Sequence, residues 1–468
     1  MDVSEQTTEA ADARGSIFGG HLRATSTGLL ILVTLIAFEA MAVSTALPTA
    51  ARSLHGLGAF GWAFTGFLVA NVVGMVASGQ LSDTRGPRLP LVAGLLAFLA
   101  GLALSGTATT MVQLVGGRVV QGLGGGLIVT AIYVIAGQVY PEHLRPALFA
   151  ATSSAWVVPS LVGPGVSGLL TQHASWRWVF LGLLPFAVVA GALLGPILRT
   201  LHPPAVPAVG RSGRIGWAVA VAAGIAALEQ AGQHPSPATL ALGAGGLVLL
   251  LAGLRPLLPQ GTFRLRPGVA APIALRGLLA GTFFGVESLI PLSLSVQHGY
   301  GATAAGLPLA VSGFTWSAGS WWQGRVDDAA RPGRRVVLVR AGFVLNAAAA
   351  AVMALAAVPS LPGWLAYPSW MLAGLGAGLT MSSVSVLMLK YTTDADRGAD
   401  SAALQLSDAT ASALTTGLAG VLVAAAARGA ISYTTAFVGL DVALCGLGLV
   451  GALAGGRARA PETVSALK

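Results

Sequence analysis

A single glutamate interrupts an otherwise apolar run near the start of the chain. The stretch at 34–48 reads TLIAFEAMAVSTALP, and Glu39 is its one charged residue. A second apolar run, GTFFGVESLIPLSL at 281–294, carries Glu287 in the same way. Because burial disfavours the charged form of a carboxyl group, such an acid can bind and release a proton near neutral pH. These two acids therefore predict proton exchange, or the binding of a cation, in an apolar environment.

Further charged residues also lie inside apolar runs. The segment LVGGRVVQGLGGGL at 114–127 holds Arg118. A charge near the middle of a bilayer costs about 2.5–3.5 kcal/mol on insertion scales, so each such group should face a partner or a wet cavity. Arg118 either tunes a proton-binding acid or locks its helix by hydrogen bonds. The remaining acids of this kind are Glu229, Asp408 and Asp441. Glu229 and Asp441 suit structural or near-surface roles. The candidates for proton coupling are Glu39, Glu287, Arg118 and Asp408.

The composition indicates a polytopic membrane protein. Of 468 residues, 54% are hydrophobic and only 9% are charged, and the mean hydropathy is +0.77. Several soluble domains of this length would need far more polar surface. The formal net charge of +9 comes from arginines between the apolar runs, so membrane topology explains it better than nucleic-acid binding does.

The sequence also argues against an enzyme. Cys445 is the only cysteine, which excludes a disulfide within the chain and a cysteine metal cluster. The seven histidines form no metal-spaced cluster, and the sequence has neither a nucleotide-binding loop nor a nucleophile elbow. We therefore expect no metal and no cofactor, and the lack of a nucleotide-binding loop argues against ATP as the source of energy.

The apolar runs predict about fourteen transmembrane helices, since a span needs roughly 20 apolar residues. They form an N-terminal bundle of six helices at 26–200, a linker with two additional helices at 201–266, and a C-terminal bundle of six helices at 267–456. The tails at 1–25 and 457–468 are expected to be cytoplasmic. The expected spans are 26–50, 59–82, 89–106, 111–137, 147–171, 176–198, 215–233, 236–258, 269–297, 302–324, 335–357, 362–389, 401–427 and 432–455.

The basic residues between these spans give the orientation. Basic residues concentrate in cytoplasmic loops. With a cytoplasmic N-terminus, the opposite side receives only Arg52, Arg177 and Arg428. The cytoplasmic connections receive Arg85, Arg88, Arg145, Arg199, Arg211, Arg214, Arg255, Arg264, Arg266, Arg325, Arg331, Arg334, Arg335, Lys390 and Arg397.

The connection between the second and third spans carries a compact motif, GQLSDTRGPRLPL at 79–91. Gly79 permits a close helix contact, and Gly86 permits a tight turn. Asp83 can face a helix N-terminus, whose partial positive charge favours an anion, and Arg88 holds the cytoplasmic side. The loop after the tenth span, GRVDDAARPGRR at 324–335, has glycine, acid, glycine and arginine in the same order, which indicates that the two six-helix halves are repeats.

The fifth span contains VVPSLVGPGVSGLL at 157–170. Its prolines remove backbone donors and its glycines loosen the helix, so a kink or a close helix crossing is expected there. Gly163, Pro164 and Gly168 are therefore candidates, with Gly79, Asp83, Gly86 and Arg88, for conformational gating.

Taken together, these motifs resemble the major facilitator superfamily. GQLSDTRGPR is similar to its signature loop, LVGGRVVQGLGGG to its arginine motif on the fourth helix, and PSLVGPGVSG to the fifth-helix motif associated with antiporters. SWRWVF at 175–180 and the central helix pair resemble the fourteen-helix drug:proton antiporter family. The resemblance implies a cavity between two six-helix bundles, alternating access and proton coupling.

Under this resemblance the candidate substrate-binding residues are Glu39 and Glu287 together with aromatic side chains. The leading hypothesis is a multidrug exporter of small lipophilic or cationic compounds that works as a monomer in the cytoplasmic membrane. A dedicated exporter of one metabolite, peptide or antibiotic, and a lipid-handling or sensor protein, are the alternatives. The aromatic candidates, for each of which packing or lipid contact is the other interpretation, are Trp62, Phe67, Tyr133, Trp156, Phe284 and Trp316.

Overall fold

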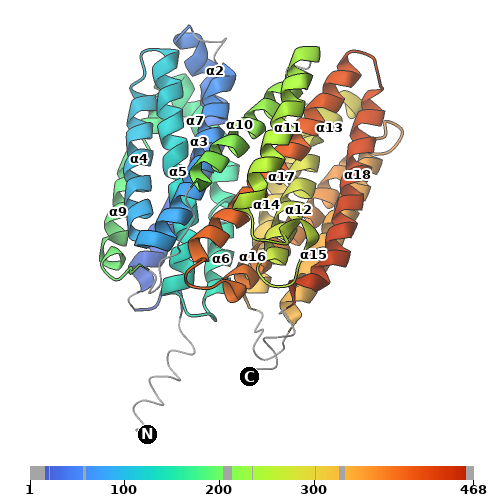
Figure 1. The fold of residues 1–468 in the computed structure, drawn as a ribbon. Helices are drawn as coiled ribbons and strands as arrows, with labels where there is room; N and C mark the ends of the chain where they lie inside the picture. The colour runs from blue at the N-terminus through green and yellow to red at the C-terminus, as the bar shows by residue number, and fades with distance from the viewer. Residues whose placement is uncertain are drawn as a thin grey trace.

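The computed structural model describes residues 16–20, 22–55, 60–203, 213–233, 236–300, 302–325 and 333–459, and within these ranges the chain is helical apart from short connections (Figure 1). The tails predicted to be cytoplasmic lie mostly outside these residues. The helices are α2 (Leu22–Ser53), α3 (Phe60–Arg85), α4 (Arg88–Gly106), α5 (Met111–Val139), α6 (Arg145–Ser154), α7 (Val157–His173), α8 (Trp178–Leu181), α9 (Leu184–Leu198), α10 (Arg214–Gln233), α11 (Pro237–Leu257), α12 (Ala270–Glu287), α13 (Ile290–His298), α14 (Ala302–Gly324), α15 (Arg334–Ala356), α16 (Ala366–Tyr391), α17 (Arg397–Ala427) and α18 (Tyr433–Ala454).

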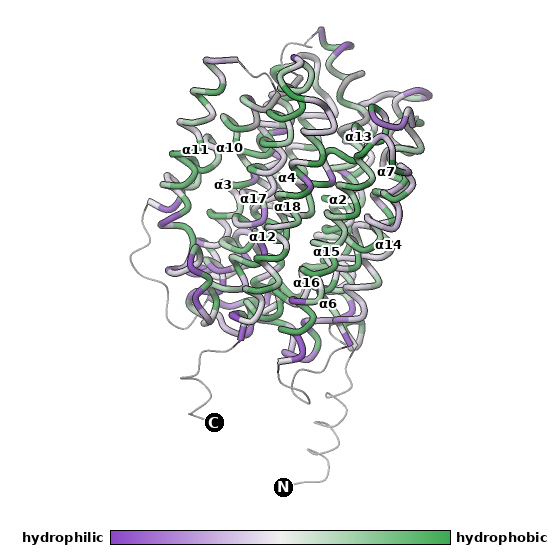
Figure 2. The backbone as a smooth tube through the Cα atoms, turned by 90° about the vertical axis from the view of Figure 1, so that its right-hand side faces the viewer, coloured by the Kyte–Doolittle hydropathy of each residue, from purple (hydrophilic) through white to green (hydrophobic). Residues whose placement is uncertain are grey.

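Eleven helical segments in the described part of the chain are long and apolar enough to cross a membrane. Three further segments, α6 with α7, α10 and α14, occupy the remaining places among the fourteen spans predicted from sequence. Figure 2 shows the hydrophobic positions along the length of the helices and many of the hydrophilic ones at their ends. The prediction of an all-α membrane protein with about fourteen helices is therefore confirmed.

The helices form two groups with the same internal packing. In the first group α5 packs against α3, and in the second α16 packs against α14. A Cβ atom on Gly126 would lie 2.1 Å from the carbonyl oxygen of Asn71, and one on Gly378 would lie 2.1 Å from that of Trp316. Only glycine permits such a close approach of two helix backbones. The matching contacts indicate that the two halves are structural repeats.

The central pair, α10 and α11, packs between the two halves. Glycines join the two helices closely, since a Cβ on Gly224 would meet the carbonyl oxygen of Gly246 at 2.5 Å. Figure 1 shows this pair in green in front of the boundary between the halves, and α10 contacts both α3 of the first half and α17 of the second. Val221 and Ile225 of α10 are buried in the main hydrophobic core. The pair thus covers the boundary between the halves on the side where α3 and α17 lie.

Three of the expected spans are broken into two helices. The sixth span divides into α8 and α9 between Leu181 and Leu184. The ninth span divides into α12 and α13 between Glu287 and Ile290, and Pro291 lies in the first turn of α13. The fifth span divides into α6 and α7 at residues 155–156, before Pro159. Proline is tolerated in the first turn of a helix because the amide there has no partner within the helix. The break in the fifth span therefore precedes the glycine- and proline-rich stretch in which a kink was expected.

Candidate functional site

Glu39 and Arg118 form a buried ion pair between α2 and α5. Glu39 is 0% exposed and Arg118 is 3% exposed. The guanidinium Nη1 of Arg118 donates to Glu39 Oε1, and the second carboxylate oxygen, Oε2, has no hydrogen-bond partner in the structure. The two residues lie 79 positions apart in the sequence, so the fold brings together two side chains that sequence analysis had selected separately.

Polar and aromatic groups surround the Arg118 guanidinium. It donates from Nη1 to Gln121 Oε1 at 2.8 Å and from Nε to the carbonyl oxygen of Ala63 at 3.3 Å. The ring of Phe67 lies beneath it, with its centroid 4.2 Å from Cζ. A desolvated cation over an aromatic face is favourable. Arg118 thus has three further partners besides the Glu39 carboxylate.

The close packing of α5 explains why Arg118 has a fixed position. Gly122 lies against the backbone of α3, and Gly117 and Gly124 lie against α4. A Cβ on Gly124 would approach the Phe98 amide nitrogen to 2.5 Å. Since α5 is wedged between two helices by its glycines, the direction of the Arg118 side chain is set by helix packing.

A second buried ion pair, which the sequence analysis missed in part, joins α12 to α17. Asp408 was predicted, but its partner, Arg276, was not. Arg276 donates from Nε and Nη2 to Asp408 Oδ2 at 3.1 and 2.9 Å, and from Nη1 to Ser385 Oγ at 3.1 Å. The Asp408 side chain is 18% exposed and that of Arg276 is 6% exposed. Arg276 could have been found, because it is a charge within the apolar run 269–297, as Arg118 is within its own helix.

The other two acids differ from these pairs. Glu287 ends α12 and is partly exposed, and no hydrogen bond or ion pair is described for its carboxylate. Asp441 of α18 is 3% exposed, so it is buried rather than near the surface. The side chain of Glu229 lies outside the described part of the structure. Among the intramembrane acids whose side chains the structure describes, Glu287 is therefore both partly exposed and without a described partner.

The predicted aromatic residues are spread over several places. Phe284 and Trp316 both contact Phe283, with ring centroids at 5.3 and 5.0 Å. Tyr133 packs against Phe149 at 5.2 Å. Phe67 lies under Arg118, whereas Trp62 and Trp156 are 63% and 42% exposed. The structure thus brings Phe284 and Trp316 together and leaves Trp62 and Trp156 at the surface.

Asp83 connects the two halves of the molecule. Its Oδ1 accepts from the backbone N–H of Gly398 at 2.6 Å, and its Oδ2 accepts from that of Ala399 at 2.8 Å. Both amides belong to the first turn of α17 in the second half. The carboxylate therefore meets unpaired N–H groups and the positive end of the helix dipole. We call the end of the molecule that contains this contact the Asp83 end.

The neighbouring residues of the motif make this contact possible. A Cβ on Gly79 would lie 2.5 Å from the carbonyl oxygen of Gly398, so a larger residue would separate α3 from α17. Gly86 has a φ of +81°, which favours glycine, and it ends α3 in a turn. Arg88 begins α4 and is exposed. These four residues lie together at the Asp83 end.

The candidate gating residues of α7 do not gather in this way. Gly163 lies against α2, where an added Cβ would be 3.2 Å from Met41 Cβ. An added Cβ on Gly168 would meet no atom within 4 Å, so this glycine is not required for a close contact in the present conformation. The Pro164 side chain lies outside the described part of the structure.

Further contacts close the molecule at the Asp83 end. Gln323 at the end of α14 donates to the carbonyl oxygen of Pro146 in α6 at 3.2 Å. Ser153 Oγ of α6 lies 3.3 Å from Ser382 Oγ of α16. Each of these contacts joins the first half to the second. The described conformation is therefore closed at this end.

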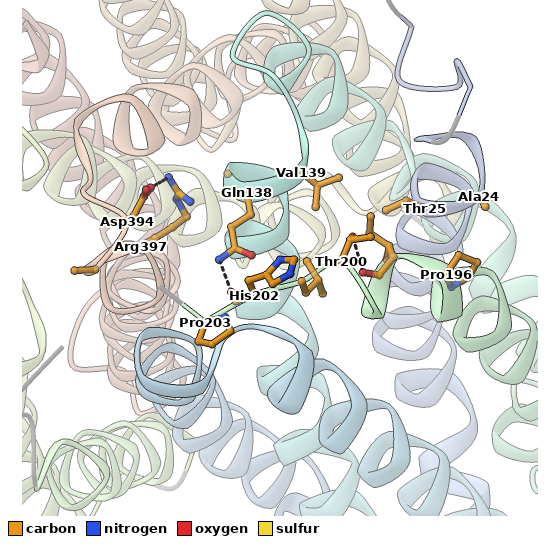
Figure 3. Close-up of a pocket in the computed structure, with 14 residues that line it drawn as sticks. Ala24, Thr25, Gln138, Val139, Pro196, Thr200, His202, Pro203, Asp394 and Arg397 are labelled. Carbon is orange, nitrogen blue, oxygen red and sulfur yellow. Dashed lines mark hydrogen bonds and ion pairs between the residues drawn. The ribbon is translucent and has the colours of Figure 1, made fainter. Parts of the chain in front are cut away.

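A cleft of about 910 Å³ opens at the Asp83 end (Figure 3). It lies between α5, the end of α9 and the residues before α17. Its charged side chains, Asp394 and Arg397, are paired with each other, and Gln138 donates to the carbonyl oxygen of His202 at 3.4 Å. None of the buried acids lines this cleft. We assign it no role in binding.

The fold and the two intramembrane ion pairs define a membrane transporter built from two repeated halves. The family profile described as Major Facilitator Superfamily matches residues 29–416. The chain therefore belongs to the major facilitator superfamily, and the resemblance noted from its motifs is confirmed.

Relatives and solved structures support the same assignment. The chain is 28% identical over 389 residues to an uncharacterised MFS-type transporter of Mycobacterium tuberculosis, an alignment that covers 78% of this chain and 54% of the relative. It is 30% identical over 164 residues to a multidrug transporter of Bacillus subtilis, covering 35% and 30%. The chain thus spans about a third to a half of these relatives. The human organic anion transporter MFSD10 superposes with a TM-score of 0.69 at 14% identity, covering 92% of this chain and 99% of that one, which supports the fold.

Proposed function

We propose that this protein is a proton-coupled secondary active transporter that exports small lipophilic or cationic compounds by alternating access. The observation that carries the proposal is the Glu39–Arg118 pair, an acid without exposure whose second oxygen has no partner. Intramembrane ionisable groups are functional by default, because their burial is costly. The multidrug transporter of Bacillus subtilis is a relative whose name agrees with this activity.

Glu39 is the proton-coupling residue in this proposal. When it is ionised, Arg118 neutralises it within the first half. When it binds a proton, the ion pair is lost, and Arg118 retains Gln121 and the Ala63 carbonyl group as partners. The guanidinium therefore keeps two hydrogen-bond partners when the acid is neutral, but it then lacks a counter-charge, which favours loss of the proton from Glu39.

Glu287 is the residue that receives a cationic group of the substrate. Glu39 and Glu287 lie the same number of residues from the first residues of α2 and α12, Leu22 and Ala270, so both are roughly 25 Å along their helices. Partial exposure and the lack of a described partner leave the Glu287 carboxylate available. Phe284, one turn earlier on α12, and Trp316 supply nearby apolar surface.

Asp83 acts in gating. Its two hydrogen bonds to α17 hold the first half against the second, and they must break when the Asp83 end opens. The distribution of arginines supports a cytoplasmic location for this end. Transport would use the proton gradient across the cytoplasmic membrane, without a cofactor, in a single chain.

Proton release from the purified protein tests the proposal. Lipophilic cations and neutral drugs are added to the full chain in detergent and weak buffer. Several compounds should release protons from the wild type but not from Glu39→Gln. Asp441→Asn, which neutralises another buried acid, is the matched control and should behave as the wild type.

The pattern of release separates the alternatives. Release by a single compound would favour a dedicated exporter of one metabolite. No release from folded wild-type protein would overturn multidrug antiport and leave a dedicated exporter of a compound outside the panel, or a lipid-handling or sensor role. Release that persists unchanged in Glu39→Gln would remove Glu39 from the coupling step.

A further inference from the structure

A small cavity lies between the end of α14 and the start of α15. Its volume is about 390 Å³, and it is lined by Ala318, Trp321, Trp322, Arg325 and Arg334. Gln323, the residue after Trp322, contacts the first half at the Asp83 end, so the cavity lies at that end of the molecule. The transport cycle proposed above uses none of the side chains that line it.

Two arginines give this cavity a positive charge. Arg325 and Arg334 are both exposed, and no hydrogen bond or ion pair is described for either guanidinium. The next residue, Arg335, differs from them, because it is 3% exposed and donates to Gln323 Oε1 at 2.8 Å. One arginine at the start of α15 therefore holds the protein together, whereas Arg325 and Arg334 are open to an anion.

Two tryptophans accompany these arginines. Trp321 and Trp322 are 56% and 57% exposed, and tryptophan is favoured where a membrane meets water. The Cζ atom of Arg325 lies 3.4 Å from the centroid of the Trp321 ring. Stacking on a ring uses the face of a guanidinium and leaves its in-plane N–H groups to bind a carboxylate or a phosphate. Trp321 thus holds Arg325 at the depth expected for lipid headgroups.

Exposed apolar side chains continue from the cavity along both helices. Phe314 lies two turns before Trp321 on the same face of α14 and is 56% exposed. On α15, Val337 follows Arg334 by one turn, and Val344 lies two turns further on. These valines are 62% and 52% exposed. A molecule with a charged head at the arginines and an apolar body would therefore meet matching surface.

The repeat in the first half lacks these side chains. Gly74 of α3 and Gly319 of α14 occupy matching places, since an added Cβ would lie 2.4 or 2.5 Å from a carbonyl oxygen of the neighbouring helix. Counted from these glycines, Val76, Ala77 and Gln80 stand where the second half has Trp321, Trp322 and Arg325. The packing of the repeat is thus formed without the tryptophans and the arginine, so the fold does not explain them.

We propose that this cavity binds the headgroup phosphate of an anionic phospholipid, whose acyl chains lie against the exposed apolar side chains of α14 and α15. Arg325 and Arg334 bind the phosphate, as basic pockets between membrane helices bind anionic headgroups. The N-terminus of α15 adds to the attraction, because Gly333 provides no side-chain cap there and the positive end of the helix dipole favours an anion. This inference goes beyond the proposed transport function and does not depend on proton coupling.

Lipid binding to the purified full chain tests the site. Native mass spectrometry of the delipidated protein in a neutral detergent gives dissociation constants for phosphatidylglycerol and for phosphatidylcholine with the same acyl chains. The wild type should bind phosphatidylglycerol more tightly. Replacing both Arg325 and Arg334 by glutamine should weaken that binding about 30-fold, since each basic residue near a membrane surface contributes about fivefold. Binding of phosphatidylcholine should not change.

The matched control replaces Arg199 and Arg255 by glutamine. These exposed arginines, at the end of α9 and in the last turn of α11, carry the same total charge but lie outside the cavity. The control should bind phosphatidylglycerol as the wild type does. An equal loss in the control would overturn the inference, because the attraction would then come from net charge rather than from this cavity.

Trp321→Leu provides a second variant that alters no charge. Loss of the ring under Arg325 should weaken phosphatidylglycerol binding by about 2- to 5-fold. The thermal unfolding temperature without lipid is measured for every variant. It should stay near that of the wild type, because the replaced side chains are exposed, and this separates loss of the site from loss of the fold.

Two further outcomes would overturn the proposal. Soluble glycerol phosphate should fail to displace the lipid at equal concentration, and displacement would mean that the cavity takes free phosphates rather than a lipid. Unchanged phosphatidylglycerol binding after both arginines are replaced would reject the site. That result is expected if Asp327 and Asp328, which lie outside the described residues, neutralise the arginines. Proton release is not part of this assay, so the lipid site and the transport function are tested separately.

Discussion

Equivalent positions on α5 and α16 carry a charged side chain in the first half, Arg118, and an aromatic side chain in the second, Trp370. In the first half, α2 and α5 meet through Glu39 and Arg118. In the second half, α12 and α16 meet through Phe283 and Trp370, whose ring centroids are 4.8 Å apart. Arg118 is the eighth residue of α5, and Trp370 is the fifth residue of α16.

The glycines establish that these places correspond. Gly122 lies four residues after Arg118, and Gly374 lies four residues after Trp370. Each glycine packs on the backbone of its neighbouring helix, where an added Cβ would lie 2.2 or 2.3 Å from a carbonyl oxygen. The repeat has therefore kept its backbone packing while its charged residues have changed position.

The difference teaches that helix packing and the placement of charged side chains are separable in this fold. Each charged group of a buried ion pair needs an opposite charge and hydrogen-bond partners, whereas two aromatic rings need only van der Waals contact with each other. The second half has its own ion pair, Arg276–Asp408, but on a different pair of helices, and it is more exposed. We expect the first half to be sensitive to charge and the second to volume.

The largest effect is expected from Arg118→Met. This change leaves Glu39 buried without a cation, and breaking a buried pair costs about 3–5 kcal/mol of stability. It should also abolish proton release. Unfolding of the purified protein in detergent measures the loss, and Glu39→Gln combined with Arg118→Met should recover part of it. A double variant as unstable as Arg118→Met alone would contradict an ion pair at this position.

A somewhat smaller effect is expected from Trp370→Leu. Trp370 is 1% exposed, and the smaller side chain leaves a void beside Phe283 that costs about 2–3 kcal/mol. Proton release should persist, because no charge is altered. Loss of release in a folded Trp370→Leu protein would show that the aromatic contact takes part in coupling.

Equal, intermediate effects are expected from Gly126→Ala and Gly378→Ala. Each added Cβ would overlap a carbonyl oxygen of the neighbouring helix at 2.1 Å, and overpacking costs about 1–3 kcal/mol. Thermal unfolding measures both. Gly116→Ala, where an added Cβ meets no atom within 4 Å, is the control. A large difference between the two variants would argue against equivalent packing in the two halves.

The smallest effect is expected from Phe67→Leu. Loss of the ring under Arg118 removes a cation–π contact of roughly 0.5–2 kcal/mol and retains the ion pair. The protein should remain folded and release protons, with a slightly lower unfolding temperature. A loss as large as that of Arg118→Met would mean that the ring, rather than the carboxylate, holds Arg118 in place.

Much of the architecture could be predicted from the sequence because each membrane span can be recognised from the composition of its own segment. The long apolar runs predicted the membrane helices, and the arginines between them predicted the orientation of those helices. The capping role of Asp83 was also predictable in kind, since an acid in such a loop suits a helix N-terminus. That α17 supplies this terminus depends on how the halves meet.

The sequence by itself determined that buried charges exist and that each needs a partner. It identified Glu39, Arg118 and Asp408, although Arg276 was passed over. Only the tertiary structure decided the partners, which lie 79 positions apart in one pair and 132 in the other. The physical reason is that side chains on different helices meet according to the rotation and separation of those helices, and glycines such as Gly122 and Gly374 fix both through contacts made far along the chain.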